Sequence, residues 1–255
     1  MSQRTTLQDP DEPQRKRPRT VPDSGTGSDE PPFSRDAKFW YPDGSIIILA
    51  QNVGFRVFKS LLAASSDVFR DMFALAQPSD HLQDASDDYP VVHVSDTAAE
   101  MRSLLTVLLD ARQYMWARRT FAFEDIANCV RLAHKYGIKD LLKDSLAEIE
   151  RYYPAKFESW DTRAIPCADG HAIIAVNLAR LTGTTSLLPA ALYCCCQMNA
   201  RELMDGYERS DGTVDRLSKE DLERCIDGKS HLSLHCMHRP IPHVHPHLPL
   251  YNPIA

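Results

Sequence analysis

The spacing of apolar residues changes between residues 43 and 73, and this change limits the folds that the chain can adopt. The stretch reads DGSIIILAQNVGFRVFKSLLAASSDVFRDMF. Its first half holds two short apolar runs, each introduced by a turn sequence, Asp43-Gly44 and then Asn52-Val53-Gly54. Short apolar runs bounded by such turns predict a β-hairpin. From Leu61 to Phe73, apolar residues recur at spacings of three, four and seven, which is typical of helices. We therefore expect a hairpin that leads directly into helices.

The residues that follow predict further elements of both kinds. The run Tyr89 to Val94 predicts a strand, with Pro90 at its entry, where a missing N–H is tolerated. Ser95-Asp96-Thr97 can cap the next helix, whose apolar stripe runs from Met101 to Leu109. Two more helices are expected at 123–136 and 139–152, with Gly137 ending the first in a positive-φ conformation. Short strands separated by helices indicate an α+β fold.

Helical patterns continue beyond Pro154. The segments AIIAVNLARL (172–181) and LLPAALYCCCQM (187–198) are short and apolar. The run LSKEDLERCIDG (217–228) begins with a capping-box pattern, Ser218 followed three residues later by Asp221. These segments predict a helical extension to the α+β region.

Taken together, the motifs resemble a family. The succession D-G-x-I-I-I-L, F-R-V-x-K-x-x-L and S-x-V-F-R-D-M-F is similar to the start of a BTB/POZ domain, of the type abundant in mushroom-forming (basidiomycete) fungi. The strand at 91–94, the helix at 104–109 and the run AHKYGI at 133–138 extend the resemblance over about residues 36–152. It implies a small sheet covered by helices, and dimerisation or adaptor use through the helices and the first strand. The segments 187–198 and 217–228 also resemble the helical extension of those fungal proteins.

Three positions depart from the family pattern. Ser45 stands where the family usually has an acidic residue, and Phe58 stands where it usually has histidine. These changes are expected to remove charge from the pocket at the dimer interface. The stretch Ala74 to Pro78 also lacks the glutamate that degradation adaptors carry after the Met-Phe pair. Recruitment of a cullin-type ubiquitin ligase is therefore a weakened expectation.

The two ends of the chain differ in composition from its middle. Residues 1–32 are rich in proline and charge and contain almost no large apolar side chains, so we expect them to be disordered. They include a basic cluster, Arg15, Lys16, Arg17 and Arg19, which indicates either a nuclear-import signal or a solvated charge run. At the other end, residues 229–255 are rich in histidine and proline and are expected to be a disordered tail. The predicted organisation is therefore a disordered segment at 1–32, a BTB/POZ domain at 33–152, a helical extension at 153–228 and the tail at 229–255.

Composition narrows the class of protein. The net charge of −6 argues against a surface devoted to nucleic acid, and no apolar run is long enough to span a bilayer. The first residues lack the apolar core of a secretion signal, and seven cysteines, three of them consecutive, favour free thiols. We expect a nuclear or cytoplasmic location.

Possible chemical sites have simpler interpretations. His231, His235 and Cys236, with the alternating histidines at 243–247, suggest zinc, but no Cys-x-x-Cys motif accompanies them and prolines interrupt the second cluster. Cysteines 194–196 lie in an apolar helix, where buried unreactive thiols are the default. His134 is expected to pack or cap a helix end.

The sequence contains none of the common catalytic motifs, such as a phosphate-binding loop or a nucleophile elbow. We expect no enzyme activity, no cofactor, no metal site and no catalytic residue. The favoured function is a protein-interaction module whose partners are proteins, including a second copy of the chain. The alternatives are a nuclear regulatory protein that contacts nucleic acid through the basic cluster, or a cullin-type ligase adaptor.

Overall fold

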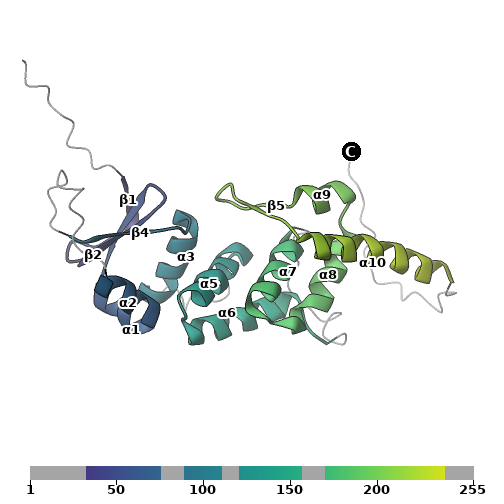
Figure 1. The fold of residues 1–255 in the computed structure, drawn as a ribbon, viewed down its shortest axis with the longest axis horizontal. Helices are drawn as coiled ribbons and strands as arrows, with labels where there is room; N and C mark the ends of the chain where they lie inside the picture. The colour runs from purple at the N-terminus through teal and green to yellow at the C-terminus, as the bar shows by residue number, and fades with distance from the viewer. Residues whose placement is uncertain (1–32, 76–88, 111–120, 157–169, 239–255) are drawn as a thin grey trace, which may run out of the picture. The chain divides into compact units, whose positions relative to one another are not determined.

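The computed structural model describes residues 33–75, 89–110, 121–156 and 170–238. These residues form one small mixed sheet followed by a series of helices and a short second hairpin (Figure 1). Residues 32–255 cluster as one unit. Within the described ranges, no helix combines the length and the apolar character needed to cross a membrane.

The sheet contains the predicted hairpin. Its strands, in the order β1-β3-β2-β4, are β1 (Ser34–Trp40), β3 (Val53–Val57), β2 (Ile46–Ala50) and β4 (Val91–Val94). Strands β2 and β3 are antiparallel, with Ile46 opposite Val57 and Ala50 opposite Val53. Strands β1 and β4 pair in parallel with β3 and β2. All five residues of β2 are buried, as expected for a central strand.

Strand β1 was not predicted, because its sequence, SRDAKFW, is mostly polar and does not alternate. Its register against β3 shifts between Arg35 and Trp40. Within this irregular part, the Asp36 carboxylate accepts hydrogen bonds from the backbone N–H groups of Lys38 and Phe39, both at 2.9 Å. It also pairs with Arg102 at 2.7 Å. An interrupted ladder and these side-chain contacts together therefore hold the edge strand.

The helices of the first part agree closely with the sequence patterns. They are α1 (Lys59–Ser65), α2 (Asp67–Leu75), α3 (Ala98–Leu109), α5 (Phe123–Lys135) and α6 (Lys139–Tyr152). Thr97 caps α3 in a capping box with Glu100. Gly137 follows α5 with φ at +66°, a conformation that favours glycine. In Figure 1, α1 and α2 lie together on one side of the sheet.

The extension is more elaborate than the sequence indicated. It contains α7 (His171–Thr182), a 3-10 turn (Thr185–Leu187), α8 (Leu188–Gln197), α9 (Ala200–Asp205), the two short strands β5 (Tyr207–Glu208) and β6 (Val214–Asp215), and α10 (Lys219–His238). Helix α9 and the β5–β6 hairpin have no counterpart in the sequence interpretation.

Helix α10 also differs from expectation. Its start agrees with the predicted box, since the Asp221 N–H donates to Ser218 Oγ at 3.2 Å. The helix then passes through Gly228, the predicted boundary, and ends at His238. A Cβ at Gly228 would lie 3.1 Å from Cys196 Sγ, so a glycine here lets α10 approach α8 closely. The boundary at 228 is therefore not a helix end, although residues 231–235 are exposed.

Two main hydrophobic cores share helix α5. One face of α5, with Cys129, Leu132 and Ala133, belongs to the core under the sheet. The opposite face, with Phe123, Ala127 and Val130, belongs to a second core built with α6, α7 and α8. A smaller cluster of Phe33, Ile47 and Leu49 covers the other face of the sheet. The extension therefore completes a core that begins within the first part of the chain.

Candidate protein-interaction surface

Helices α1 and α2 expose apolar side chains while burying others. Leu62, Phe69 and Phe73 are almost fully buried. Leu61, Val68 and Leu75 are 50%, 44% and 81% exposed. Among the described residues between 44 and 151, these three are all of the large apolar side chains that are exposed. We call Leu61, Val68 and Leu75 the α1–α2 surface. Leu61 lies on α1, and Val68 and Leu75 lie seven residues apart on α2, which packs against α1. Exposed apolar residues on neighbouring elements can mark an interaction site.

Two positions that depart from the family pattern, Ser45 and Phe58, lie beside the start of α1. Both side chains are uncharged, and each contacts a neighbouring residue. Ser45 Oγ accepts a hydrogen bond from the Lys59 N–H at 3.1 Å, at the start of α1. The ring of Phe58 stacks on Tyr41, with 5.2 Å between centroids. The Lys59 ammonium donates to the carbonyl of Phe73 at 3.2 Å. Ser45 thus accepts a hydrogen bond at the start of α1, and Phe58 packs against Tyr41.

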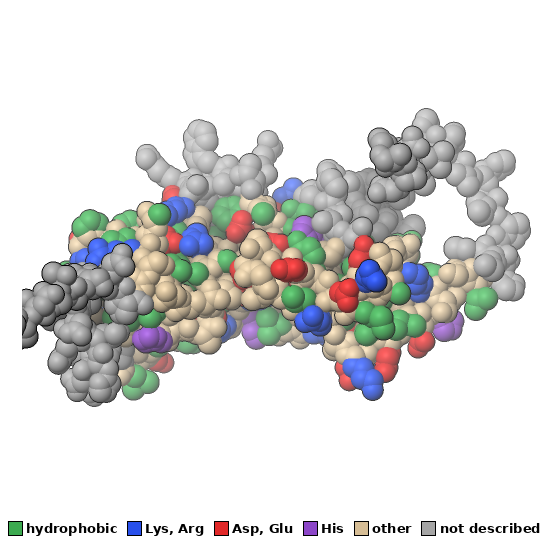
Figure 2. All heavy atoms as spheres, turned by 90° about the horizontal axis from the view of Figure 1, so that it is seen from above, with side chains coloured by type: hydrophobic (Ala, Val, Ile, Leu, Met, Phe, Trp, Pro, Cys, Tyr) green, Lys and Arg blue, Asp and Glu red, His purple; other side chains and the backbone are tan. Residues whose placement is uncertain are grey.

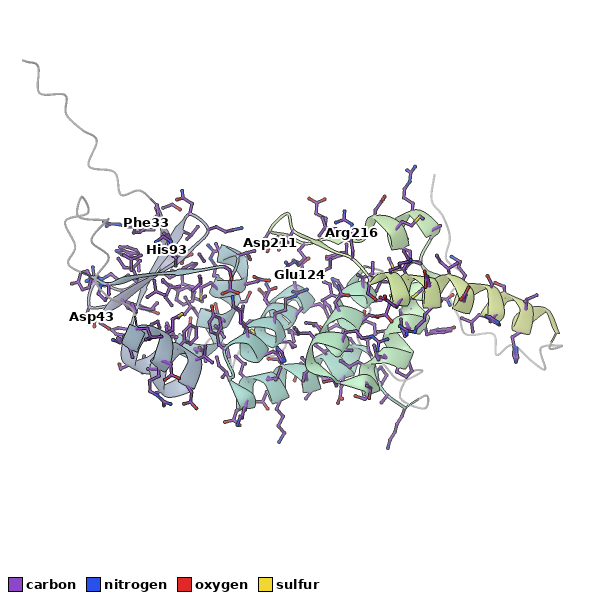
Figure 3. All side chains as sticks on the ribbon, viewed as in Figure 1. Phe33, Asp43, His93, Glu124, Asp211 and Arg216 are labelled. Atoms are coloured by element: carbon purple, nitrogen blue, oxygen red, sulfur yellow. The ribbon has the colours of Figure 1, made fainter. Side chains whose placement is uncertain are left out.

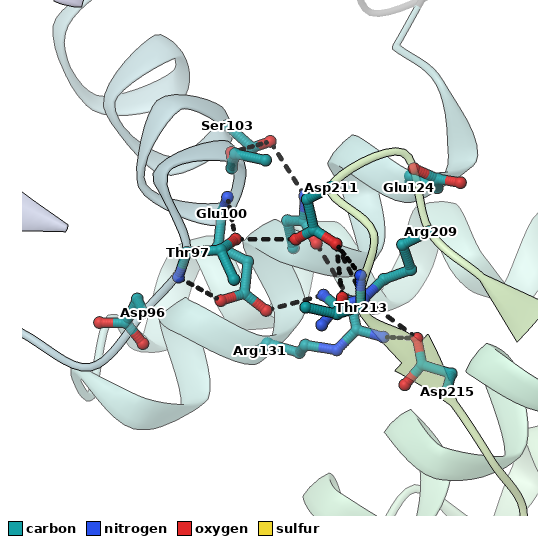
Figure 4. Close-up of polar contacts among 12 residues, drawn as sticks. Asp96, Thr97, Glu100, Ser103, Glu124, Arg131, Arg209, Asp211, Thr213 and Asp215 are labelled. Atoms are coloured by element: carbon teal, nitrogen blue, oxygen red, sulfur yellow. Dashed lines mark hydrogen bonds and ion pairs between the residues drawn. The ribbon is translucent and has the colours of Figure 1, made fainter. Parts of the chain in front are cut away.

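A second notable feature is the group of charges that ties the β5–β6 hairpin to α3 and α5, which we call the hairpin clamp (Figure 4). Arg209 pairs with Glu100 at 2.8 Å, and Arg131 pairs with Asp215 at 2.7 Å. The Thr97 hydroxyl donates to Asp211 at 2.8 Å. The four ion-paired side chains are at most 15% exposed, so water screens these pairs weakly.

Glu124, at the start of α5, binds the same hairpin. Its carboxylate accepts hydrogen bonds from the Tyr207 hydroxyl at 2.7 Å and the Ser210 hydroxyl at 2.6 Å. Figure 3 shows Glu124 and Asp211 on their separate elements near this junction. Burial opposes ionisation of Glu124 and Asp211, but the hydrogen bonds outweigh it and lower the pKa of both. The hairpin is thus held by ionised carboxylates.

The charges visible on one face of the molecule are mixed. Figure 2 shows acidic and basic side chains interspersed there, without a broad patch of one sign. The predicted import signal, Arg15, Lys16, Arg17 and Arg19, lies outside the described residues. Most of the segment that lacks the adaptor glutamate, residues 76–78, also lies outside them.

The remaining candidate residues lie on helices other than α1 and α2 or outside the described residues. His231 and His235 are exposed on α10, and the second histidine cluster lies outside the described residues. Among the described residues, no three metal-binding side chains are grouped to hold an ion. His134 is exposed in the last turn of α5, which suits the predicted role at a helix end.

Sequence reasoning missed the hairpin clamp, because its partners are far apart in the chain. Arg209 lies 109 residues from Glu100, and Tyr207 lies 83 residues from Glu124. The only local signal was the turn sequence Ser210-Asp211-Gly212, which is typical of a tight turn. That turn sequence does not indicate which residues elsewhere in the chain would bind the hairpin.

Comparison with known proteins agrees with this architecture. The family model of the BTB/POZ domain matches residues 44–151, which include the hairpin, α1, α2, α3, α5 and nearly all of α6. A search of curated proteins found no match to the chain. The fold is α+β, with the small mixed sheet and helical cluster that the resemblance implied. Residues 44–151 of this chain are therefore a BTB/POZ domain, a protein-interaction fold.

Proposed function

We propose that this chain is a non-catalytic scaffold that pairs with a second copy of itself through the α1–α2 surface. The observation that carries the proposal is the exposure of Leu61, Val68 and Leu75, while the other large apolar side chains described in the BTB/POZ domain are at least partly covered. Burying such side chains against a partner removes apolar area from water and favours association. The uncharged contacts of Ser45 and Phe58 beside α1 support an apolar contact.

Size-exclusion chromatography with light scattering, on the full chain across a dilution series, tests the pairing. We expect a dimer that dissociates on dilution. Leu61→Asp should raise the dissociation constant about tenfold or more, because a charge in an apolar interface costs more than about 1.4 kcal/mol.

Leu181→Asp is the matched control, because Leu181 is 47% exposed but lies on α7, outside the BTB/POZ domain. It should leave the dissociation constant unchanged. A chain that stays monomeric at every concentration would rule out self-pairing. Equal weakening by both variants would place the contact elsewhere.

A further inference from the structure

One serine joins the turn of the β5–β6 hairpin to helix α5. The hairpin reverses at residues 209–212, where the Gly212 N–H donates to the Arg209 carbonyl at 2.9 Å. Gly212 has φ at +79°, a conformation that favours glycine. Within this turn, Ser210 donates its hydroxyl to one Glu124 oxygen at 2.6 Å and its backbone N–H to the same oxygen at 3.1 Å. A single residue therefore makes two contacts between the turn and α5.

Ser210 is exposed and lies in an acidic stretch of the chain. Arg209 is the one basic residue within five positions of it, whereas four acidic residues lie in the same range: Asp205, Glu208, Asp211 and Asp215. An exposed serine among carboxylates complements the basic substrate groove of an acidophilic protein kinase. The turn therefore presents a hydroxyl in a setting that such an enzyme can recognise.

We propose that Ser210 is a phosphorylation site whose modification releases the hairpin turn from α5. A protein kinase catalyses the step, and ATP is the phosphoryl donor. The Ser210 oxygen attacks the γ-phosphorus of ATP and an O–P bond forms, while the bond from that phosphorus to its bridging oxygen breaks and ADP leaves. The hydroxyl proton passes to a base of the kinase. Because the hydroxyl is bonded to Glu124, the kinase acts on a transiently opened turn.

The phosphate turns an attractive contact into a repulsive one. Burial opposes ionisation of Glu124, but the hydrogen bonds from Ser210 and Tyr207 outweigh it and lower the pKa of this carboxyl. Phosphoserine carries a charge of about −1.5 to −2 at pH 7, so it repels the Glu124 carboxylate that the hydroxyl had bound. The ion pairs of Arg209 and Asp215 with the BTB/POZ domain use other atoms of the hairpin. Release therefore begins at the turn.

Phosphate mapping by mass spectrometry tests whether the site is modified. One sample is the full chain purified from a eukaryotic expression host with phosphatase inhibitors. The other is the unmodified chain incubated with Mg²⁺, ATP and purified casein kinase, an acidophilic protein kinase. We expect phosphate on Ser210, its removal by phosphatase, and its absence from Ser210→Ala. A Ser210 without phosphate in both samples overturns the proposal.

Hydrogen exchange tests the release, with phosphoserine placed at position 210 during translation of the full chain. We expect the amides of residues 207–215 to exchange about tenfold faster or more than in the unmodified chain. The reason is that a hydrogen bond to a charged group stabilises the closed turn by about that factor. In Glu124→Gln, phosphoserine should accelerate exchange much less, because the facing charge is absent.

Ser186→Asp is the matched control. Ser186 also donates its hydroxyl to a glutamate of another helix, Glu150 at 3.1 Å, but it lies before α8 and not in the hairpin. A charge at that position should leave exchange at 207–215 unchanged, whereas Ser210→Asp should accelerate it. Unchanged or slower exchange with phosphoserine at 210 overturns the release, and so does equal acceleration by the two aspartate variants.

Discussion

At the scale of single residues, Ser66 separates the two helices that carry the α1–α2 surface. The sequence from Leu61 to Phe73 reads as one run of helical spacing, but the structure divides it at Ser66, which is extended between α1 and α2. Its buried hydroxyl accepts a hydrogen bond from the Phe69 N–H at 3.0 Å and donates to the carbonyl of Tyr136 at 2.5 Å. The run is therefore two helices, and Leu61 and Val68 are exposed although their spacing suggested burial.

Replacing Ser66 by alanine should lower the free energy of unfolding by about 1–3 kcal/mol, because it removes a helix cap and leaves a buried carbonyl without this donor. Urea unfolding followed by circular dichroism measures the change. The neighbouring Ser65 is exposed and bonds only within its own helix, to the Leu61 carbonyl at 3.0 Å. Ser65→Ala is therefore expected to change stability by less than about 0.5 kcal/mol. Equal losses in the two variants would contradict this role.

At the scale of elements, the β5–β6 hairpin is the clearest case of structure that depends on distant partners. Each strand has two residues, and the ladder consists of two residue pairs. An isolated hairpin of this size is not stable in water. Its shape persists because Arg209 and Asp215 are held by Glu100 and Arg131 on helices of the BTB/POZ domain. The clamp thus fixes the position of the hairpin, although burying its charged side chains carries a desolvation penalty.

Arg209→Met should therefore destabilise the protein by about 3–5 kcal/mol, because Glu100 would keep its buried charge without this partner. Lys219→Met is the matched control, since Lys219 pairs with Glu223 at 3.8 Å on the surface and is 83% exposed. We expect that variant to change stability by less than about 1 kcal/mol. Hydrogen exchange should show the loss of protection in Arg209→Met beginning at 207–215. Unchanged protection there would show that the clamp does not hold the hairpin.

At the scale of the whole molecule, the BTB/POZ domain and its extension depend on one another through α5. Phe123 and Ala127 face the second core, while Leu132 and Ala133 face the core under the sheet. The sequence suggested a boundary near residue 152, but the second core draws side chains from both sides of it, including Ile149 and Ala172. The charged contacts of the clamp join the same two parts. Loss of these contacts should therefore affect the stability of the whole described unit.

Acid should weaken the unit in two steps. Burial lowers the pKa of His171 below the ordinary histidine value of 6.5. As pH falls through about 6.5, this histidine therefore takes up a proton more readily in the unfolded state than in the folded state. The free energy of unfolding falls as a result. The pKa values of Glu124, Asp211 and Asp36 are also lowered, from ordinary values of 4.5, 3.8 and 3.8. These three carboxylates stabilise the folded state at pH above their ordinary pKa values, and this stabilisation is lost as pH falls below those values.

Urea unfolding at constant ionic strength, across a pH series, measures both steps. Asp211→Asn should make the lower step smaller, because only Glu124 and Asp36 then contribute to it, and should leave the upper step near 6.5 in place. His171→Gln should do the reverse. A free energy of unfolding that rises on acidification would contradict the assigned directions.

Several elements could be predicted from local patterns in the sequence. The hairpin of β2 and β3, the Thr97 cap, the glycine after α5 and the length of α6 all follow from turn residues and apolar spacing within a few positions. The same patterns carried the resemblance to the BTB/POZ domain that the family model confirms.

The features that join distant parts of the chain depend on contacts between elements and could not be predicted from local patterns. These are the polar edge strand β1, the exposure of Leu61 and Val68, the hairpin clamp, and the contact of Cys196 in α8 with the Cys225 carbonyl in α10. In each case the stabilising partner lies on another element, often tens of residues away, so no local pattern records it. The physical reason is that apolar periodicity reports which face of one element is buried, whereas ion pairs and helix contacts depend on where elements meet.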